Sequence, residues 1–382
     1  MKKRIPYNLP DIDPQTGETV LSVLQSNWLT TGKRTQEFEA QLANYTTSDY
    51  CIALSSCTAA LHLSLLACGI GPGDEVITTV FTFVGTIEAI IYCGATPVLV
   101  DVEPETLNID PVKVKEKITN KTKAIMPVHY AGHPCAMDEI LAIAKQHNLF
   151  VVEDAAHAIG ALYNGKKIGS LDSTATCFSF YATKNMTTGE GGAVATHNKK
   201  LAETVRLLSM HGITKDALAR YGSAGDWHYD VTEIGYKYNI TDIQSAIGIE
   251  QLKKLDTMNQ RRRELANIYT ASLRQNQNVM VPIEKDYATS AWHLYPIRLQ
   301  NEKLRDHLIA YLKEQGVATS LHFIPVCLFT VMKKHYGFPE KDYPVALDAF
   351  RRIVSLPLYP GLSNDDVHYV ADSVLKAVGS YA

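Results

Sequence analysis

The stretch TCFSFYATKNMTTGEGGAV, residues 176–194, decides both the predicted fold and the predicted chemistry of this chain. It places Lys184 a few residues after a short apolar segment and just before a glycine-rich turn. A lysine forms an imine with a carbonyl only as the neutral amine, and a loop between two buried strands can supply the desolvated surroundings that lower its pKa. Because most loop lysines are simply solvated, a reactive lysine has to be supported by neighbouring segments.

Two upstream segments supply that support. LFVVEDAAHA, residues 149–158, predicts a buried parallel strand that ends at Glu153 and Asp154, and ligands of open α/β sheets bind at such strand ends. We therefore expect Asp154 to face a cofactor nitrogen. CIALSSCTAALHLSLLACGIG, residues 51–71, predicts a strand, a Ser/Thr turn and an amphipathic helix that opens near Thr58, where free backbone N–H groups suit a phosphate. An acid, an imine-forming lysine and a phosphate cradle are the parts that pyridoxal phosphate requires.

The chain divides into two predicted regions. Strand-like and helix-like segments alternate from Cys51 to about Met210, which predicts a mostly parallel α/β sheet with helices on both faces. Two helices should follow at residues 242–255 and 261–274, the first with Thr241 as its N-cap and the second beginning with three arginines on a solvated face. The segments WHLYPIRL (292–299) and VATSLHF (317–323), with helices at 303–315 and from Asp365, predict a smaller α+β domain. We place the domains at 1–255 and 256–382.

Composition limits the function classes. With 382 residues the chain can bury a sizeable core, and its net charge of −3 gives no case for binding nucleic acid or an anionic membrane. Seven cysteines without CxxC spacing argue against a disulfide framework and for a reducing, cytoplasmic compartment. Pro6, Asn8 and Pro10 interrupt any apolar signal-peptide core, and no uncharged apolar run is long enough to span a bilayer.

Seven short motifs carry a family resemblance. They are LTTGK (29–33), SSCTAAL (55–61), GPGDEVI (71–77), EDAAHA (153–158), FSFYATKN (178–185), GEGG (189–192) and GYKYN (235–239). In this order they resemble the sugar aminotransferases of the DegT/DnrJ/EryC1/StrS family over nearly the whole chain. The resemblance implies a fold-type I pyridoxal phosphate-dependent transferase, with a large, mostly parallel sheet domain and a smaller C-terminal α+β domain.

The resemblance also implies a role for each residue of the cofactor site. Lys184 would hold pyridoxal phosphate covalently and move the proton, while Asp154 would pair with the pyridinium nitrogen. His157 and Phe83 would lie on opposite faces of the ring; many relatives carry other residues at these two positions. The remaining implied residues bind the phosphate, with the last one reaching across from a partner subunit: Thr58, Ala59, Ser179 and Asn239. Three further positions resemble substrate-side residues, namely Thr31, Lys237 and His322.

The implied activity is transfer of an amino group from L-glutamate to a nucleotide-linked keto-sugar, with a UDP-linked 4-keto-hexose or pentose as the expected acceptor. The cofactor would cycle through pyridoxamine phosphate, and two half-reactions at one site imply ping-pong kinetics. The product would enter an amino sugar of a surface polysaccharide, lipid or glycan. The enzyme would be a homodimer with shared active sites.

The sequence leaves other functions open. A keto-sugar dehydratase of the same fold would carry histidine in place of Lys184, and a non-catalytic cofactor-binding regulator would be expected to have lost Lys184, Asp154 or Ser179. An NAD-dependent enzyme would need a glycine fingerprint after a strand, whereas GIGPGDEV (69–76) precedes one. His129 and His133 have the i, i+4 spacing of metal ligands, but no HExxH frame accompanies them, and we predict no metal.

Overall fold

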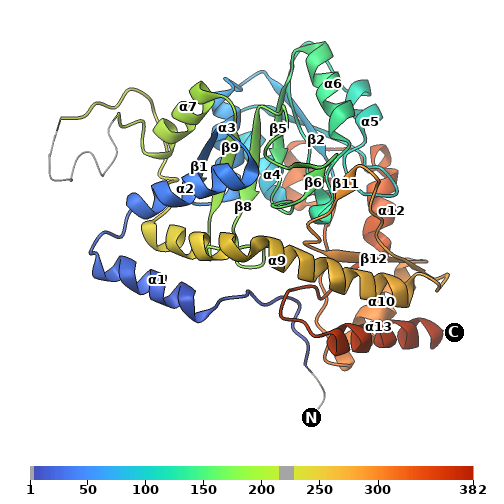
Figure 1. The fold of residues 1–382 in the computed structure, drawn as a ribbon. Helices are drawn as coiled ribbons and strands as arrows, with labels where there is room; N and C mark the ends of the chain where they lie inside the picture. Colours follow the sequence, from blue (N-terminus) through green and yellow to red (C-terminus); the bar gives the residue numbers. More distant parts are fainter. Residues whose placement is uncertain (1–3, 215–227, 382) are drawn as a thin grey trace.

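A seven-stranded sheet with the strand order β1-β9-β8-β5-β4-β2-β3 lies at the centre of the larger part of the molecule (Figure 1). The computed structural model describes residues 4–214 and 228–381. Four of the six strand pairings in this sheet are parallel, and only β9 runs against its two neighbours, so the predicted mostly parallel sheet is confirmed. The strands are β1 (Tyr50–Leu54), β2 (Glu75–Thr79), β3 (Thr96–Val100), β4 (Thr122–Met126), β5 (Phe150–Asp154), β8 (Ala175–Ser179) and β9 (Gly192–Thr196).

Alternate residues of each strand face two different cores, because successive side chains of a strand point to opposite faces. In β5, Val151 packs into the core on one face and Val152 into the core on the other. The first face is covered by helices α2 (Lys33–Thr46), α5 (Pro111–Glu116) and α6 (Met137–His147), and by the start of α9 (Asp242–Leu273). The second face is covered by α3 (Cys57–Ala67), α4 (Val84–Tyr92) and α7 (Lys199–Ser209).

Helix α3 differs from the predicted amphipathic helix. Its side chains from Ala59 to Leu65 are all buried, including His62 and Ser64. It packs between α4 and α7 as well as against the sheet, so little of its surface remains for solvent. Ser56 caps its first turn, where its side chain accepts a hydrogen bond from the Ala59 N–H.

The two helices predicted between residues 242 and 274 are wrong, because α9 is one continuous helix of 32 residues. No glycine or proline lies between Leu255 and Arg261 that would end the first of the two predicted helices. The predicted N-cap is correct: Thr241 and Gln244 form a capping box at its start. The predicted domain boundary at residue 255 falls inside this helix, whose residues up to Met258 pack on the sheet and whose residues from Leu265 pack on a second core.

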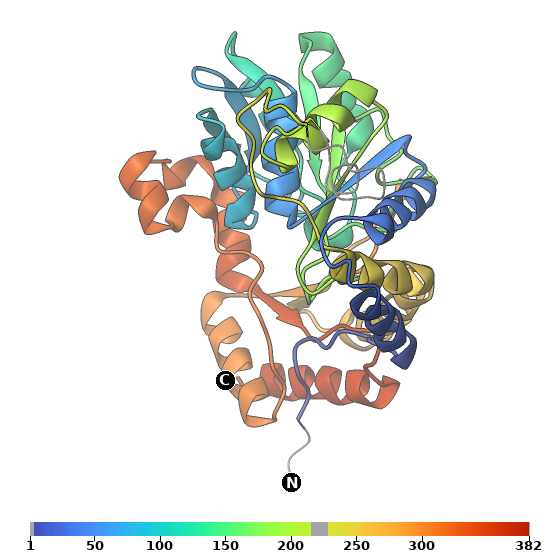
Figure 2. The same ribbon diagram turned by 90° about the vertical axis from the view of Figure 1, so that its left-hand side faces the viewer.

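The second core lies beneath the sheet domain in Figures 1 and 2. It contains a three-stranded sheet of β10 (Val279–Met280), β12 (Tyr295–Leu299) and β13 (Ile353–Leu356), flanked by α10 (Glu302–Glu314), α12 (Pro344–Arg352) and α13 (Asn364–Gly379). The segment VATSLHF forms no strand and makes only two isolated bridges, Val317 with Ile5 and Ser320 with Ser355. Ile5 itself packs in the second core.

The other α-helices and strands of the described residues are α1 (Pro14–Gln25), α11 (Thr330–His335) and a small sheet of β6 (Leu162–Tyr163), β7 (Lys166–Lys167) and β11 (Ala288–Thr289). Within residues 4–214 and 228–381, no helix combines the length and apolar character needed to cross a membrane.

The three arginines of α9 do not form the predicted solvated face. Arg262 is 1% exposed and donates to the Leu358 carbonyl at 2.7 Å. Arg261 donates to the Leu362 carbonyl, and Arg263 pairs with Glu284 at 2.8 Å. A guanidinium has five donors in a planar fork, which lets these side chains join α9 to the loops of the second core.

Candidate active site

A cavity of about 390 Å³ opens at the carboxyl ends of the parallel strands. This is the edge at which open α/β sheets bind ligands. Its wall is formed by segments that follow β1, β2, β4, β5 and β8, together with His293, His322 and Phe323 from beyond α9. The cavity is therefore enclosed by the sheet domain on one side and by the C-terminal part of the chain on the other.

Lys184 lies on the turn that follows β8 and is partly exposed to the cavity. The turn is closed by its own backbone, because the Lys184 N–H donates to the Tyr181 carbonyl at 2.9 Å. Desolvation in the cavity wall lowers the pKa of Lys184 to about 8, although the nearby Asp154 carboxylate opposes the shift. Near pH 8, half of such lysines are neutral amines, the form that attacks carbonyls.

Asp154 ends β5 and is 5% exposed. Its Oδ2 accepts a hydrogen bond from the Thr86 hydroxyl at 2.7 Å, and its Oδ1 accepts one from the Ala156 N–H at 3.1 Å. No ion pair within the described residues includes this carboxylate. Burial raises its pKa, while the two hydrogen bonds and the nearby Lys184 lower it. The Cys57 thiol is a third, weaker donor, at 4.0 Å from Oδ1. A desolvated carboxylate in a cavity wall, held by these donors and without an ion-pair partner, is suited to a cationic ligand atom.

The start of α3 forms another part of the wall, at Ser56, Cys57 and Thr58. Neighbouring glycines allow a close approach here. A Cβ at Gly85 would lie 2.8 Å from the Thr58 hydroxyl, and one at Gly192 would lie 2.4 Å from the Ser56 backbone carbon. The backbone N–H groups of a helix start and nearby hydroxyls make a cradle for a phosphate.

Three aromatic side chains form a column at the side of the cavity. His157 stacks on Phe323, with ring centroids 5.7 Å apart and an interplanar angle of 18°. His293 lies against the same imidazole, at 4.3 Å between centroids. Burial lowers the pKa of both histidines well below the usual value, and the positive charge of Lys184 adds to this effect. Both imidazoles are therefore neutral near pH 7.

The structure brings most of the predicted site residues together. Seven of the eleven line the cavity: Thr58, Phe83, Asp154, His157, Ser179, Lys184 and His322. Ala59 is buried behind the cavity wall, and its N–H is taken by Ser56. Thr31 and Asn239 lie outside the wall and bind each other, with the Asn239 amide donating to the Thr31 hydroxyl at 2.8 Å. Lys237 is exposed on the same segment as Asn239.

The sequence analysis did not predict several of the residues that line the cavity. Thr82 and Thr86 follow the carboxyl end of β2, so the rule that found Asp154 after β5 could have found them. The two hydroxyls lie 2.7 Å apart, and because the Thr86 hydroxyl donates its hydrogen bond to Asp154, Thr82 is the donor between them. His293 and Phe323 stand in segments without a local signal, and only the fold brings them to the cavity.

The two histidines weighed as metal ligands have other partners. His129 Nδ1 accepts from the Cys135 N–H at 3.0 Å, and its Nε2 lies 2.7 Å from Glu153. His133 Nε2 accepts from the Lys285 N–H at 3.0 Å, and its Nδ1 lies 2.7 Å from the Pro134 carbonyl. No group of three or more metal-ligating side chains is present in the parts of the chain that the structure describes.

Comparison with known proteins identifies the family. Residues 10–375 match the sequence pattern of the DegT/DnrJ/EryC1/StrS aminotransferase family. The chain belongs to this family. It is 46% identical to the spore coat polysaccharide biosynthesis protein SpsC of Bacillus subtilis, over 98% of this chain and 96% of SpsC.

Two solved structures from other organisms share the fold of this family member. The Streptococcus pneumoniae protein Spr1654, in its pyridoxamine phosphate form, superposes with a TM-score of 0.93 at 34% identity, covering 98% of this chain and 99% of its own. PseC of Helicobacter pylori, an aminotransferase of pseudoaminic acid biosynthesis, superposes with a TM-score of 0.92 at 31% identity, covering 99% of this chain and all of PseC. The predicted fold-type I architecture is confirmed.

Pyridoxal phosphate is the cofactor of this family, and the Streptococcus pneumoniae protein is known in forms with pyridoxal phosphate and with pyridoxamine phosphate. The cavity of the present chain fits that group. It offers one partly desolvated lysine, one buried carboxylate without a cation and a glycine-flanked helix start. The chain is therefore a pyridoxal phosphate-dependent aminotransferase of the sugar type.

Proposed function

We propose that this aminotransferase moves the amino group of L-glutamate to the keto group of a nucleotide-linked sugar, with a UDP-linked 4-keto-hexose or pentose as acceptor. The observation that carries the proposal is the placement of Lys184 and Asp154 in one cavity with the α3 start. The cavity volume of about 390 Å³ falls within the usual range for small-molecule sites. Hydroxyl and imidazole groups such as Thr183, Tyr181 and His322 give its wall hydrogen-bonding partners suited to a sugar.

Each cavity residue then has a task that its surroundings support. Bound pyridoxal phosphate supplies an electron sink for the carbanion left when an amino acid loses its α-proton. Lys184 would hold the cofactor and, as a neutral amine, take and return that proton. Asp154 would keep a proton on the ring nitrogen, and Thr58 and Ser179 would bind the phosphate with the N–H groups of the α3 start. His157 and Phe83 would bracket the ring.

The charges in the cavity also support a shared active site in a homodimer. Glutamate and a nucleotide diphosphate carry several negative charges, yet Lys184 is the single lysine and no arginine occurs among the described residues of the wall. Lys237 and Asn239 lie on one partly exposed segment outside it, and Ile234, just before them, is 92% exposed. We infer that this segment serves the cavity of a partner subunit, Asn239 towards the phosphate and Lys237 towards the substrate, with Thr31 positioning the Asn239 amide.

The acceptor is tested by incubating the purified enzyme with L-glutamate and a panel of UDP- and dTDP-linked 3-keto- and 4-keto-sugars. Mass spectrometry should show one aminated sugar nucleotide and an equal amount of 2-oxoglutarate. Amination of free keto-sugars at the same efficiency would show that the enzyme does not require a nucleotide on its acceptor. Loss of water from the sugar without gain of nitrogen would instead identify a dehydratase.

The shared site is tested by mixing Lys184→Ala and Asn239→Ala chains. In a heterodimer of the two variants, one cavity contains both substitutions and the other contains neither. With random pairing of subunits in an equal mixture, up to a quarter of the wild-type activity should therefore return. Asn239→Ala alone should be clearly impaired. If subunit exchange is verified and activity stays at the level of the separate variants, Asn239 acts within its own subunit.

We also infer a cytoplasmic enzyme whose product enters a surface polysaccharide, lipid or glycan. All seven cysteines are free, which suits a reducing compartment. The relationship to SpsC, named for spore coat polysaccharide biosynthesis, supports the destination of the product. Deletion of the gene should deplete one amino sugar from the cell-surface glycans, which compositional analysis can measure.

A further inference from the structure

The N-terminal segment of residues 5–13 is fixed at its first end to the second core. Ile5 is 2% exposed and belongs to that core. Its N–H donates to the Gly316 carbonyl at 2.9 Å, and its carbonyl accepts from the Ala318 N–H at 3.0 Å. A buried side chain with two backbone hydrogen bonds holds this end of the segment in one place.

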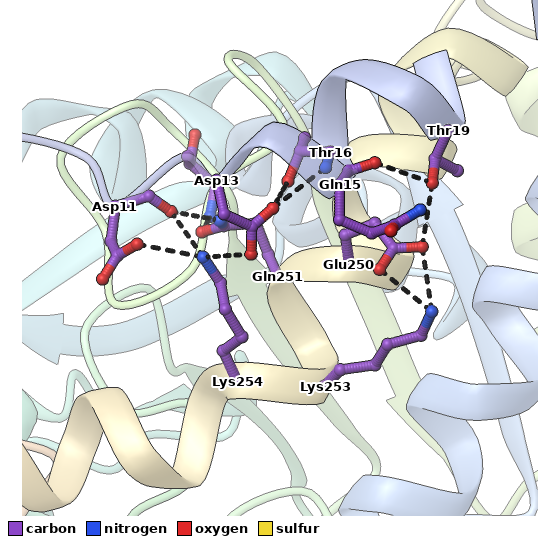
Figure 3. Close-up of polar contacts among 10 residues, drawn as sticks. Asp11, Asp13, Gln15, Thr16, Thr19, Glu250, Gln251, Lys253 and Lys254 are labelled. Carbon is purple, nitrogen blue, oxygen red and sulfur yellow. Dashed lines mark hydrogen bonds and ion pairs between the residues drawn. The ribbon is translucent and has the colours of Figure 1, made fainter. Parts of the chain in front are cut away.

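The other end of the segment is fixed to α9, in its half that packs on the sheet (Figure 3). Lys254 reaches the Asp11 carboxylate at 3.0 Å and the Asp13 carboxylate at 3.1 Å. The Asp11 carbonyl accepts from the Gln251 side chain at 2.6 Å. Asp13 also caps α1, accepting from the Thr16 N–H at 2.9 Å. The segment therefore spans from one core to the other.

Between these two anchors, Tyr7 and Asn8 touch residues of the cavity wall from outside. The Asn8 amide donates to the Thr183 carbonyl at 3.2 Å, and that carbonyl belongs to the peptide that carries the Lys184 nitrogen. The Tyr7 ring stacks on His322, with centroids 5.8 Å apart and an angle of 23°. Thr183, Lys184 and His322 line the cavity, whereas Tyr7 and Asn8 do not.

We propose that Asn8 and Tyr7 are positioning residues of the active site: Asn8 holds the turn that carries Lys184, and Tyr7 holds the ring of His322. The inference rests on the proposed role of Lys184, but it does not depend on which sugar is the acceptor. Residues that set the reacting groups without touching them matter because misplacement by about 1 Å can cost a large part of the rate.

Inside the turn, the Lys184 N–H binds the Tyr181 carbonyl, but apart from Asn8 the side-chain contacts that tie the turn to other elements are made by the residue after Lys184. Asn185, which follows Lys184, donates to the Ala291 carbonyl and to the Asn259 side chain, both at 2.7 Å. Asn8 supplies the matching contact on the residue before Lys184. Two amide side chains thus hold the two peptides that flank the reactive lysine. Asn185 is buried, but Asn8 is half-buried, so Asn8 can be changed without opening a core.

Asn8→Ala and Asn8→Asp test the first half of the proposal, because both remove the N–H donor and the second keeps the side-chain size. In the holoenzyme without substrate, the Lys184 amide should exchange hydrogen about fivefold faster, while the amides of β2 stay unchanged. The transfer rate should fall about tenfold with KM for the amino donor within about twofold. Unchanged exchange at Lys184, or equally faster exchange in β2, would overturn the role of Asn8.

Tyr7→Phe and Tyr7→Ala test the second half. Phenylalanine keeps the stacked ring and removes a hydroxyl that lies 3.5 Å from His322 Nδ1 and also interacts with Ser355. The Ser355 hydroxyl, at 3.0 Å from His322 Nδ1, remains as the stronger polar contact of that imidazole. Tyr7→Phe should therefore keep the wild-type KM for the keto-sugar, whereas Tyr7→Ala should raise it about fivefold. Equal behaviour of the two variants would contradict the stacking role. A failed keto-sugar screen would leave the exchange measurement on Asn8 standing, so the two proposals can fail separately.

Discussion

The two sides of the cavity differ in how they are built. The sheet side carries Asp154, the last residue of a strand, and Lys184, a few residues after another strand, and burial shifts the pKa of both groups. The opposite side carries neutral imidazoles and rings, including His293 and His322, delivered by segments far away in the sequence. From this difference we expect the sheet side to perform the chemistry and the opposite side to set the geometry and the fit of the substrate.

Lys184→Ala should have the largest effect of any change on the sheet side. In the proposed mechanism it removes both the attachment point for the cofactor and the base, so we expect the transfer rate to fall about 10²–10⁴-fold, the usual contribution of a positioned acid–base group. Borohydride treatment of the wild-type holoenzyme should fix the cofactor to Lys184 alone, as peptide mass mapping can show. A variant that completes both half-reactions at a near-normal rate would refute the assignment.

Asp154→Asn should lower the transfer rate about 100-fold, because a buried charge-assisted contact to the ring nitrogen contributes about 1.5–3 kcal/mol or more. In the cofactor-free protein, by contrast, the same substitution should not lower the stability of the fold. Burial raises the pKa of Asp154, so the folded state disfavours the carboxylate form and loses stability as pH rises above about 4. Removing the charge should leave the cofactor-free protein as stable as the parent, or more stable, at pH 7.

The measurement is thermal unfolding of both cofactor-free proteins between pH 3 and pH 8. The difference in stability between the parent and Asp154→Asn should shrink below about pH 4, where the Asp154 carboxyl group is protonated in the folded and unfolded chains alike. If Asp154→Asn destabilises the cofactor-free protein at pH 7, the carboxylate has a structural partner that the hydrogen bonds described above do not include.

The rate of covalent cofactor capture should depend on pH through Lys184. Desolvation lowers the pKa of this lysine to about 8. The neutral fraction, which alone attacks carbonyls, should therefore rise about 50-fold between pH 6 and pH 8 and level off above that range. Reconstitution of the cofactor-free enzyme, followed by visible absorbance, measures this profile. A midpoint near the ordinary lysine pKa of about 10.4 would show that water solvates Lys184 in the cavity wall.

The same contrast explains what the sequence could predict. Lys184, Asp154 and Thr58 stand next to strand ends or a helix start that hydrophobic patterning reveals, so their meeting at one edge follows from parallel strand order. The continuous α9 and the pairing of Thr31 with Asn239 depend on packing that no local pattern encodes. The burial of Arg262 is not predicted either, because the sequence does not show the Leu358 carbonyl that accepts its hydrogen bond.

Thr86→Val should have an intermediate effect, because it removes a hydroxyl that donates to Asp154 at 2.7 Å while keeping the side-chain shape. Losing one hydrogen bond to a carboxylate should slow transfer about tenfold. Thr82→Val serves as a graded control, since its hydroxyl donates to Thr86 and reaches Asp154 only indirectly. Its loss should cost about two- to threefold. Equal losses for both variants would mean that the hydroxyls act on the ligand and not through Asp154.

The smallest expected effect concerns the anchor of the N-terminal segment and compares two neighbouring lysines of α9 (Figure 3). Lys254 binds Asp11 and Asp13, whereas Lys253 binds Glu250 at 2.9 Å. Exposed ion pairs contribute about 0–1 kcal/mol, so Lys254→Met should slow transfer only about two- to threefold. Lys253→Met should leave the rate unchanged.

The pair is informative because both substitutions remove one positive charge from the same helix. Any general effect of charge or helix stability should therefore appear equally in both variants, as thermal unfolding can verify. An effect specific to Lys254 should disappear in Asn8→Ala, where the segment no longer holds the Lys184 turn. Lys254→Met could instead slow the Asn8→Ala enzyme by the same factor as it slows the parent. The ion pairs of Lys254 would then act by a route other than Asn8, and the N-terminal segment would not position Lys184.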